Sequence, residues 1–232
     1  MKKDQLDEAE VKPYEFTTFD KTQVESVIHY LKENCSAALS IFSTPIWRGL
    51  TNHTHPIVIA DPSTGIRKSQ NTTNYFTSLM DSSPYMKGWP KRSKSFICST
   101  SCYAKDYGVR YAIFPVNNAK IAICPTFDIW EINITIPEFE LTFNAHSTSS
   151  VENFNLWISD TLKISYDNGN WLYDAQYYPK VIDLCKQYNQ NPNDFVSILY
   201  KAIRPENTKL QLMDIDAFVR EPYITGDHEI WI

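Results

Sequence analysis

Apolar and polar residues follow two different periods along the chain, and together these predict a mixture of helices and strands. Between Thr22 and Lys32 the apolar side chains return every three or four positions, which predicts an amphipathic helix with Thr22 as its N-cap. A second helix is predicted from Asn71 to Met80. The same spacing recurs through residues 151–219, so this region is predicted to be a block of helices.

Extended segments are predicted on both sides of that block. Residues 109–114 and 120–124 are interpreted as two strands joined by a tight hairpin, because the Asn-Asn pair at 117–118 suits a two-residue turn. Further extended stretches are expected at 38–50, 95–97, 130–143 and 229–232.

The order of these elements predicts an α+β fold built as one domain. Strands bracket a helical block, which is typical of a sheet with segregated helices. We expect residues 1–20, which are polar and acidic, to be loosely ordered, and residues 21–232 to form the single domain. Within it, residues 151–219 would be a helical insertion before the last strand.

Composition narrows the classes of partner. The net charge of -5 gives no support for a general basic face that would grip nucleic acid. The local basic cluster of Lys87, Lys91, Arg92 and Lys94 is interpreted as a solvated loop. No stretch approaches the roughly 18 apolar residues of a membrane span, and no secretory signal is expected at the N-terminus, so we expect a cytoplasmic protein without membrane contact.

Cysteine and histidine usage argues against a metal centre. The five cysteines are scattered, form no Cys-x-x-Cys pair and are interpreted as reduced thiols. His53 and His55 lie two residues apart without an acid or cysteine cluster, which is thin evidence for a metal. No flanking signature supports Cys98 as a protease nucleophile, and no glycine-rich nucleotide loop is present.

Three short segments carry the candidate chemistry. Arg48, at the end of an apolar run and followed by Gly49, offers a fixed cation where a backbone can approach a ligand. Ser99-Thr100-Ser101 closes another apolar run with three hydroxyl groups, which either cap a helical turn or bind a ligand. Asp227 and Glu229 are expected on one face of the last strand, where a carboxylate can stabilise a cationic transition state.

In this order, the three segments resemble the mono-ADP-ribosyltransferases of the Arg-Ser-Glu class, a group that includes bacterial toxins and phage enzymes. The resemblance implies a split, mainly antiparallel β-sandwich that uses NAD as substrate and needs no metal. It covers only the motifs, and most of 131–219 lies outside it. The residues that carry it are Trp47-Arg48-Gly49, Phe96-Ile97-Cys98-Ser99-Thr100-Ser101 with Ala104 and Tyr107-Gly108, and Asp227-His228-Glu229-Ile230.

The resemblance also implies roles. Arg48 would hold the NAD phosphates, Gly49 would expose backbone to the nicotinamide carboxamide, and Ser99 would order the site. Glu229 would bind the nicotinamide ribose and favour the cationic transition state. The expected NAD-binding set includes these residues together with Thr100, Ser101, Tyr103, Tyr107 and Arg67.

The chain departs from the family at Asp227, where arginine-modifying members carry Glu and asparagine-modifying members carry Gln. The acceptor, a protein or a nucleic acid, therefore stays open, and so does the compartment, which is the host cytoplasm if the protein is phage-encoded or delivered. Two alternatives remain: an NAD glycohydrolase, in which water is the acceptor, and a non-catalytic interaction protein that retains the fold.

Two local ambiguities accompany this interpretation. A second Ser-Thr-Ser at 147–149 lies in a polar stretch without a preceding apolar strand, so Ser99 is preferred. Arg67 precedes the predicted helix at 71–80, where it is interpreted either as an aid to NAD pyrophosphate binding or as a solvated charge beside an N-cap.

Overall fold

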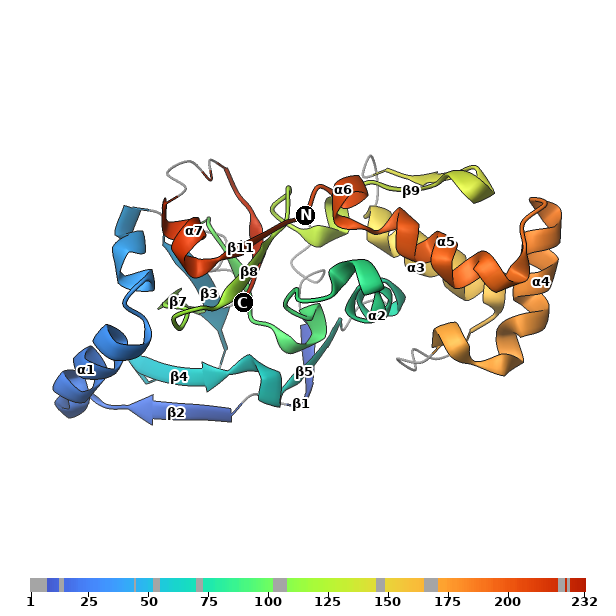
Figure 1. Cartoon of the computed structure of the whole chain (residues 1–232). Coiled ribbons are helices and arrows are strands. Elements are labelled where there is room, and N and C mark those ends of the chain that lie inside the picture. Colours follow the sequence, from blue (N-terminus) through green and yellow to red (C-terminus); the bar gives the residue numbers. More distant parts are fainter. Residues whose placement is uncertain are drawn as a thin grey trace. The chain divides into compact units, whose positions relative to one another are not determined.

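The computed structural model describes residues 8–12, 15–43, 45–51, 55–69, 73–101, 108–144, 149–164, 171–220, 224 and 226–232. Contacts between residues divide the chain into two compact units (Figure 1). The helical unit comprises 1–9, 68–88 and 128–210, and the sheet unit comprises 10–67, 89–127 and 211–232. The sequence pattern favoured one continuous core, whereas the structure has two compact units and the chain passes repeatedly between them.

The sheet unit is organised around a six-stranded sheet with the strand order β11-β8-β12-β6-β3-β7, in which every pairing is antiparallel. Its strands are β3 (Ile46–Leu50), β6 (Ile97–Ser99), β7 (Val109–Ile113), β8 (Lys120–Ile123), β11 (Gln211–Asp214) and β12 (Glu229–Trp231). The C-terminal strand β12 therefore lies between two strands that are distant in sequence.

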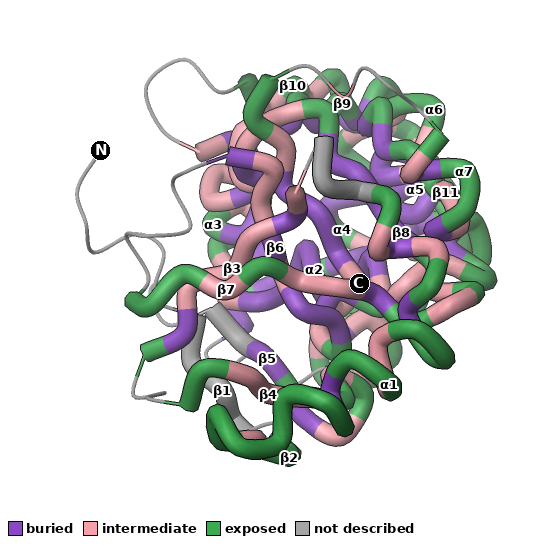
Figure 2. Tube along the Cα trace, turned by 90° about the vertical axis from the view of Figure 1, so that its left-hand side faces the viewer, coloured by how far each residue is buried: buried purple, intermediate pink, exposed green. Residues whose placement is uncertain are grey.

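One face of this sheet forms the apolar core of the unit. Ile46, Cys98, Ile121 and Ile230, one from each of four strands, are all buried there. Helices α1 (Val24–Asn34) and α7 (Ile215–Arg220) cover the cluster with apolar side chains that include Leu31. The outward side of α1 is exposed, as its amphipathic pattern requires (Figure 2).

Smaller elements complete the sheet unit. β2 (Glu15–Phe19) pairs antiparallel with β4 (Ile57–Asp61), and β1 (Glu8–Lys12) pairs with β5 (Ile66–Ser69). These strands include much of the segment 1–20, for which the polar composition predicted loose order. The predicted N-cap at Thr22 is wrong, because Thr22 lies within a short 3-10 turn that Asp20 caps.

The helical unit packs helices and a short hairpin around aromatic side chains. Its elements are α2 (Tyr75–Ser82), α3 (Ser150–Leu162), α4 (Tyr178–Gln187), α5 (Phe195–Ala202), α6 (Pro205–Thr208), β9 (Ile134–Ile136) and β10 (Leu141–Phe143). Phe154 of α3 contacts Phe76 of α2 edge-on at 6.0 Å between ring centroids. Phe139, in the β9–β10 connection, lies 6.0 Å from Phe195.

Two sequence predictions about topology are wrong. Residues 109–113 and 120–123 do form strands, but β7 lies at one edge of the sheet and β8 is separated from it by three strands, so they are not a hairpin. The helical block also ends early, because β11 and α7, at 211–220, belong to the sheet unit. The coarse α+β class is confirmed, with antiparallel sheets and helices segregated from them.

Two classes of feature are absent from the part of the chain that the structure describes. None of its helices is long and apolar enough to cross a membrane. Its His, Cys, Asp and Glu side chains form no group of three or more that could hold a metal ion.

Candidate functional site

The three segments singled out in the sequence come together on three neighbouring strands of the six-stranded sheet. Arg48 lies on β3, Ser99 ends β6 and Glu229 begins β12. Glu229 is directly opposite Ser99 in the β12–β6 register, and Ser99 is opposite Trp47 in the β6–β3 register. Ser99 and Glu229, 130 positions apart in the sequence, are thus adjacent in the fold, which local patterns could not establish.

The pleat separates these residues into two groups. Directly opposed residues of antiparallel strands point to the same face, so Ser99 and Glu229 share a face with Trp47. Arg48 is on the other face, which carries the apolar core: its guanidinium lies 5.2 Å from the Phe96 ring centroid, and its Nη1 donates to the carbonyl oxygen of Ile97. The strand alternation therefore turns Arg48 away from Glu229.

Arg92 contacts Glu229 directly. Its Nε and Nη2 donate to Glu229 Oε1 at 3.3 and 3.2 Å, and both residues are about 95% buried. Trp231 Nε1 donates to the same oxygen, and the Arg92 guanidinium lies 5.8 Å from the Trp231 ring centroid. A buried carboxylate needs such compensation, since desolvation of an uncompensated charge is costly.

Arg67 and Cys98 belong to the same electrostatic neighbourhood. Burial lowers the pKa of Arg67 to about 9, with the positive charge of Arg92 acting in the same direction and Glu229 opposing it. Burial raises the pKa of the Cys98 thiol to about 12, although the positive charges of Arg48 and Arg67 oppose that shift. The site thus combines buried guanidinium groups with one carboxylate and a thiol that stays protonated at neutral pH.

Ser99-Thr100-Ser101 acts within the fold as a clamp. Ser99 Oγ accepts a hydrogen bond from Ser101 N at 3.0 Å, which shapes the end of β6. Thr100 Oγ1 donates to the carbonyl oxygen of Gly226 and accepts from His228 N, both at 3.0 Å. The backbone of Thr100 also donates to the His228 carbonyl oxygen at 3.2 Å, so the hydroxyl and the main chain together fix the residues that lead into Glu229.

On the same face as Ser99, β3 and β7 present a cation stacked on an aromatic ring. Gly49 pairs with Arg110, whose guanidinium lies 4.3 Å from the Trp47 ring centroid. Arg110 is exposed and Trp47 is half-buried. This pair was missed by the sequence analysis, because only the cross-strand register brings residues 47 and 110 together.

Asp227 does not share a strand face with Glu229 as predicted. It is exposed and precedes β12, which starts at Glu229, and the neighbouring Gly226 has φ of +109°, a backbone conformation that suits glycine. The turn breaks the period-2 alternation on which the prediction rested.

The interpretation of the basic cluster at residues 87–94 as a solvated loop is wrong for Arg92, while Lys87, Lys91 and Lys94 are exposed as expected. Sequence reasoning missed Arg92 because runs of charged residues are usually solvated, and its neighbours Lys91 and Ser93 are polar. Arg67 reaches the site from β5 rather than from a helix N-terminus, since α2 begins only at Tyr75. Tyr103 and Tyr107 lie outside the described residues.

In the second Ser-Thr-Ser, Ser149 is the residue that the structure describes, and it has a different role. Ser149 is the N-cap of α3: its Oγ accepts from Glu152 N at 3.2 Å and donates to the carbonyl oxygen of Trp130. Ser149 therefore performs the helix-capping role that was considered for such hydroxyl clusters.

Comparison with known proteins adds no relative to this picture. No protein-family model matches the chain, and no curated protein or solved structure matches it.

Proposed function

We propose that this chain cleaves the nicotinamide–ribose bond of NAD and transfers ADP-ribose to a macromolecular acceptor. The observation that carries the proposal is the register pair Glu229–Ser99, which sets a carboxylate beside a hydroxyl on one sheet face, with the Arg92 guanidinium bound to the carboxylate. These are the chemical groups that an ADP-ribosyl donor requires: a carboxylate for the ribose, a hydroxyl that orders the site and a cation for the phosphates.

In the proposed reaction, the bond between the ribose anomeric carbon and the nicotinamide nitrogen breaks, and nicotinamide leaves with the bonding electron pair. The acceptor then forms a new bond to the same carbon and releases a proton. Glu229 stabilises the positive charge that develops on the ribose as the bond breaks. Because Arg48 lies on the opposite face, we assign the phosphate-binding role to Arg92 and Arg67, in place of the Arg48 that the sequence resemblance implied.

The test measures nicotinamide release from NAD by the purified protein and by four variants. Glu229→Gln is expected to lower the rate about 100-fold or more, as loss of an electrostatic contact to the transition state typically does. Arg92→Lys is expected to lower it more than Arg48→Lys, because Lys keeps the charge but loses the two-nitrogen contact. Glu25→Gln, an exposed position on α1, is the matched control and should leave the rate unchanged.

Folding must be checked in parallel, since Glu229→Gln removes one carboxylate that is paired with a buried arginine. Circular dichroism and NAD binding by calorimetry separate a folded, inactive variant from an unfolded one. Labelled NAD added with a cell lysate reports the acceptor: label on a macromolecule identifies a transferase, and free ADP-ribose alone identifies a glycohydrolase. If the folded wild-type protein neither binds NAD nor releases nicotinamide, the proposal is wrong.

One observation favours a non-catalytic interaction protein as the second candidate. Glu229 is only 5% exposed, and its Oε1 already accepts three N–H donors from Arg92 and Trp231. Such an arrangement also suits a structural clamp between a loop and the last strand. The absence of NAD binding by the intact, folded protein would favour this candidate.

A further inference from the structure

A pocket of about 380 Å³ opens in the helical unit, where nothing in the proposed NAD chemistry takes place. That volume falls within the range of small-molecule sites. It is formed by the turns between α3 and α4 and by the start of α5, and its lining residues are Leu162, Trp171, Leu172, Tyr173, Asp174, Ala175, Tyr177, Tyr178, Val181 and Phe195.

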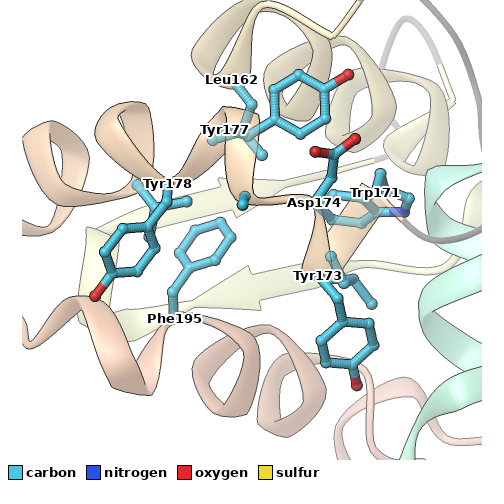
Figure 3. A pocket seen from close by; sticks show the side chains of 10 residues that line it. Leu162, Trp171, Tyr173, Asp174, Tyr177, Tyr178 and Phe195 are labelled. Atoms are coloured by element: carbon cyan, nitrogen blue, oxygen red, sulfur yellow. The ribbon is translucent and has the colours of Figure 1, made fainter.

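Half of the lining side chains are aromatic, and they are unevenly exposed. Trp171 and Phe195 are buried, at 1% and 3% exposed, and they form the rigid base. Tyr173 and Tyr178 are 68% and 47% exposed, so their rings line the solvent-facing side of the pocket. Figure 3 shows these rings around the pocket, with the carboxylate of Asp174 among them.

Three side chains of this wall, Tyr173, Asp174 and Tyr178, are hydrogen-bonded within the protein, whereas the buried Trp171 Nε1 has no partner among the described residues. Tyr173 OH is 2.8 Å from Tyr200 OH, and Tyr178 OH donates to Asn193 Oδ1 at 3.2 Å. Asp174 accepts from the backbone and side-chain nitrogens of Gln176 through its two oxygens, at 3.1 and 2.7 Å. The wall therefore offers aromatic π faces, a fixed negative charge and one buried N–H donor, Trp171 Nε1.

We propose that this pocket binds a quaternary ammonium group. Such a cation carries no N–H donor, so it needs no free hydrogen-bond acceptor in the pocket wall. Its methyl groups pack against aromatic faces that attract positive charge. Asp174 supplies the complementary charge without needing a new hydrogen bond. A primary ammonium would instead lose hydration that this wall cannot replace.

The probe is choline, followed through its N-methyl protons by NMR. Binding among aromatic rings is expected to shift these resonances upfield in a saturable manner. The matched ligand is 3,3-dimethylbutan-1-ol, which has the same shape without the charge, and we expect it to bind several-fold more weakly. Equal binding of the neutral alcohol would overturn the proposal, since the pocket would then be only an apolar site.

Three variants locate the binding. Tyr178→Leu keeps an apolar side chain but removes the π face, and it is expected to weaken choline binding about 2- to 30-fold. Asp174→Asn keeps the N-cap acceptor while removing the charge, and it should weaken choline but leave the neutral alcohol unchanged. Tyr85→Leu, at a tyrosine that is 42% exposed outside the pocket, is the control and should leave binding unchanged.

The same ligand chemistry exists in free cholines and in trimethylated lysine side chains. A peptide with one trimethyllysine, compared with the same peptide carrying unmodified lysine, distinguishes these sources. Tighter binding of the trimethylated peptide than of choline identifies a protein ligand, and the reverse identifies a small molecule. No binding of choline or of either peptide by the folded protein, or equal loss in Tyr85→Leu and Tyr178→Leu, would overturn the inference.

Discussion

The Arg92–Glu229 contact is the residue-level feature on which the stability of the sheet unit most directly depends. Because both groups are buried, removing either one takes away a buried ion-pair partner of the other. We expect Arg92→Met or Glu229→Gln alone to lower the free energy of unfolding by about 3–5 kcal/mol. The double variant should lose less than the sum, by a coupling of about 0.5–3 kcal/mol, measured by urea unfolding.

The matched control for this cycle is the exposed pair His29–Glu33 on α1, at 3.2 Å. Solvent screens such a pair, so its cycle should show no measurable coupling. Additive losses at Arg92 and Glu229 would mean that the pair does not act as a unit.

Cys98 provides a second residue-level prediction, which concerns pH. Its native pKa is raised to about 12, whereas an unfolded thiol titrates near its ordinary value of 9. Between pH 9 and 12 the unfolded state releases a proton that the native state keeps, so this group's contribution to stability is fully present below pH 9 and is lost as the pH rises. Comparison of the wild type with Cys98→Ala by urea unfolding at pH 8 and pH 10.5 should show a larger loss for the wild type.

Alkylation gives an independent check on the same thiol. Iodoacetamide at pH 8.5 should leave Cys98 unmodified in the native protein and modify it in 8 M urea, as mapped by mass spectrometry. Rapid modification of native Cys98 would contradict the burial and the raised pKa alike.

Which residues matter could be predicted from the sequence only in part. Ser99 and Glu229 were chosen from short motifs, and the register does set them side by side. The face of Arg48 could not be predicted, because it depends on which residue of a neighbouring strand it opposes. Arg92 was unpredictable for the opposite reason: its partner lies 137 positions away, and no local pattern marks a charge that will be buried.

At the scale of elements, the Thr100 hydroxyl connects β6 to the turn that precedes β12. It accepts from one backbone group of that turn and donates to another. We expect Thr100→Val to lower the free energy of unfolding by about 0.5–1.5 kcal/mol, since two hydrogen bonds of a partly exposed turn are lost while the side-chain shape is kept. Hydrogen exchange should show faster opening at His228, whose N–H would lose its acceptor.

The control for this change is Thr135→Val on β9, where the threonine is exposed in a strand. That substitution should alter stability by no more than about 0.5 kcal/mol. An equal loss of stability at both positions would show that the effect comes from replacing threonine by valine in general and not from the hydrogen bonds of Thr100.

The N-cap of α3 carries a further prediction at this scale. Ser149→Ala removes the acceptor for Glu152 N and should lower stability by about 1 kcal/mol, measured by thermal unfolding. Ser149→Asp should retain most of that stability, because a carboxylate also caps and suits the positive end of the helix dipole. A destabilised Ser149→Asp variant would instead indicate that the bond to the Trp130 carbonyl oxygen dominates.

The periodicity of apolar residues predicted the positions of helices and strands far better than it predicted which strands pair. Helix α1 and the terminal strand appear close to their predicted places, and α3, α4 and α5 lie within the predicted helical block 151–219, because the apolar residues there recur with the period of a helix. Strand pairing did not follow, since β7 and β8 are neighbours in sequence but occupy separate positions in the sheet. An asparagine pair can suit a hairpin turn, but here β7 pairs with β3 and β8 pairs with β12, so the two strands do not pair with each other.

At the scale of the whole molecule, the sequence predicted one domain with an inserted helical block, and the structure divides the chain differently. The helical unit is not a single insertion, because it takes residues 68–88 from an earlier part of the chain. Gly88 and Pro90 lie at one of the boundaries, but turn residues of this kind do not by themselves indicate a change of unit. Only the long-range packing of α2 on α3 reveals it.

This division leads to a prediction about fragments. Residues 128–210 contain most of the helical unit but lack α2, whose Phe76 packs against Phe154 and donates its backbone N–H to Asn155 Oδ1 at 2.9 Å. Asn155 Nδ2 also donates to the carbonyl oxygen of Thr73, so the missing segment satisfies both ends of a buried amide. Without it, an apolar face and a buried polar group lose their partners together.

We therefore expect the fragment 128–210 alone to lack a cooperative thermal transition and to show poorly dispersed amide resonances. Addition of a peptide spanning 68–88 should restore dispersion in a saturable manner, since it supplies Phe76 and the backbone groups that Asn155 binds. The same peptide with Phe76→Ala should bind much more weakly, because loss of a buried phenylalanine costs about 3–5 kcal/mol. If the fragment folds cooperatively by itself, the block is an independent insertion after all, and the packing of α2 on α3 contributes little to the stability of the unit.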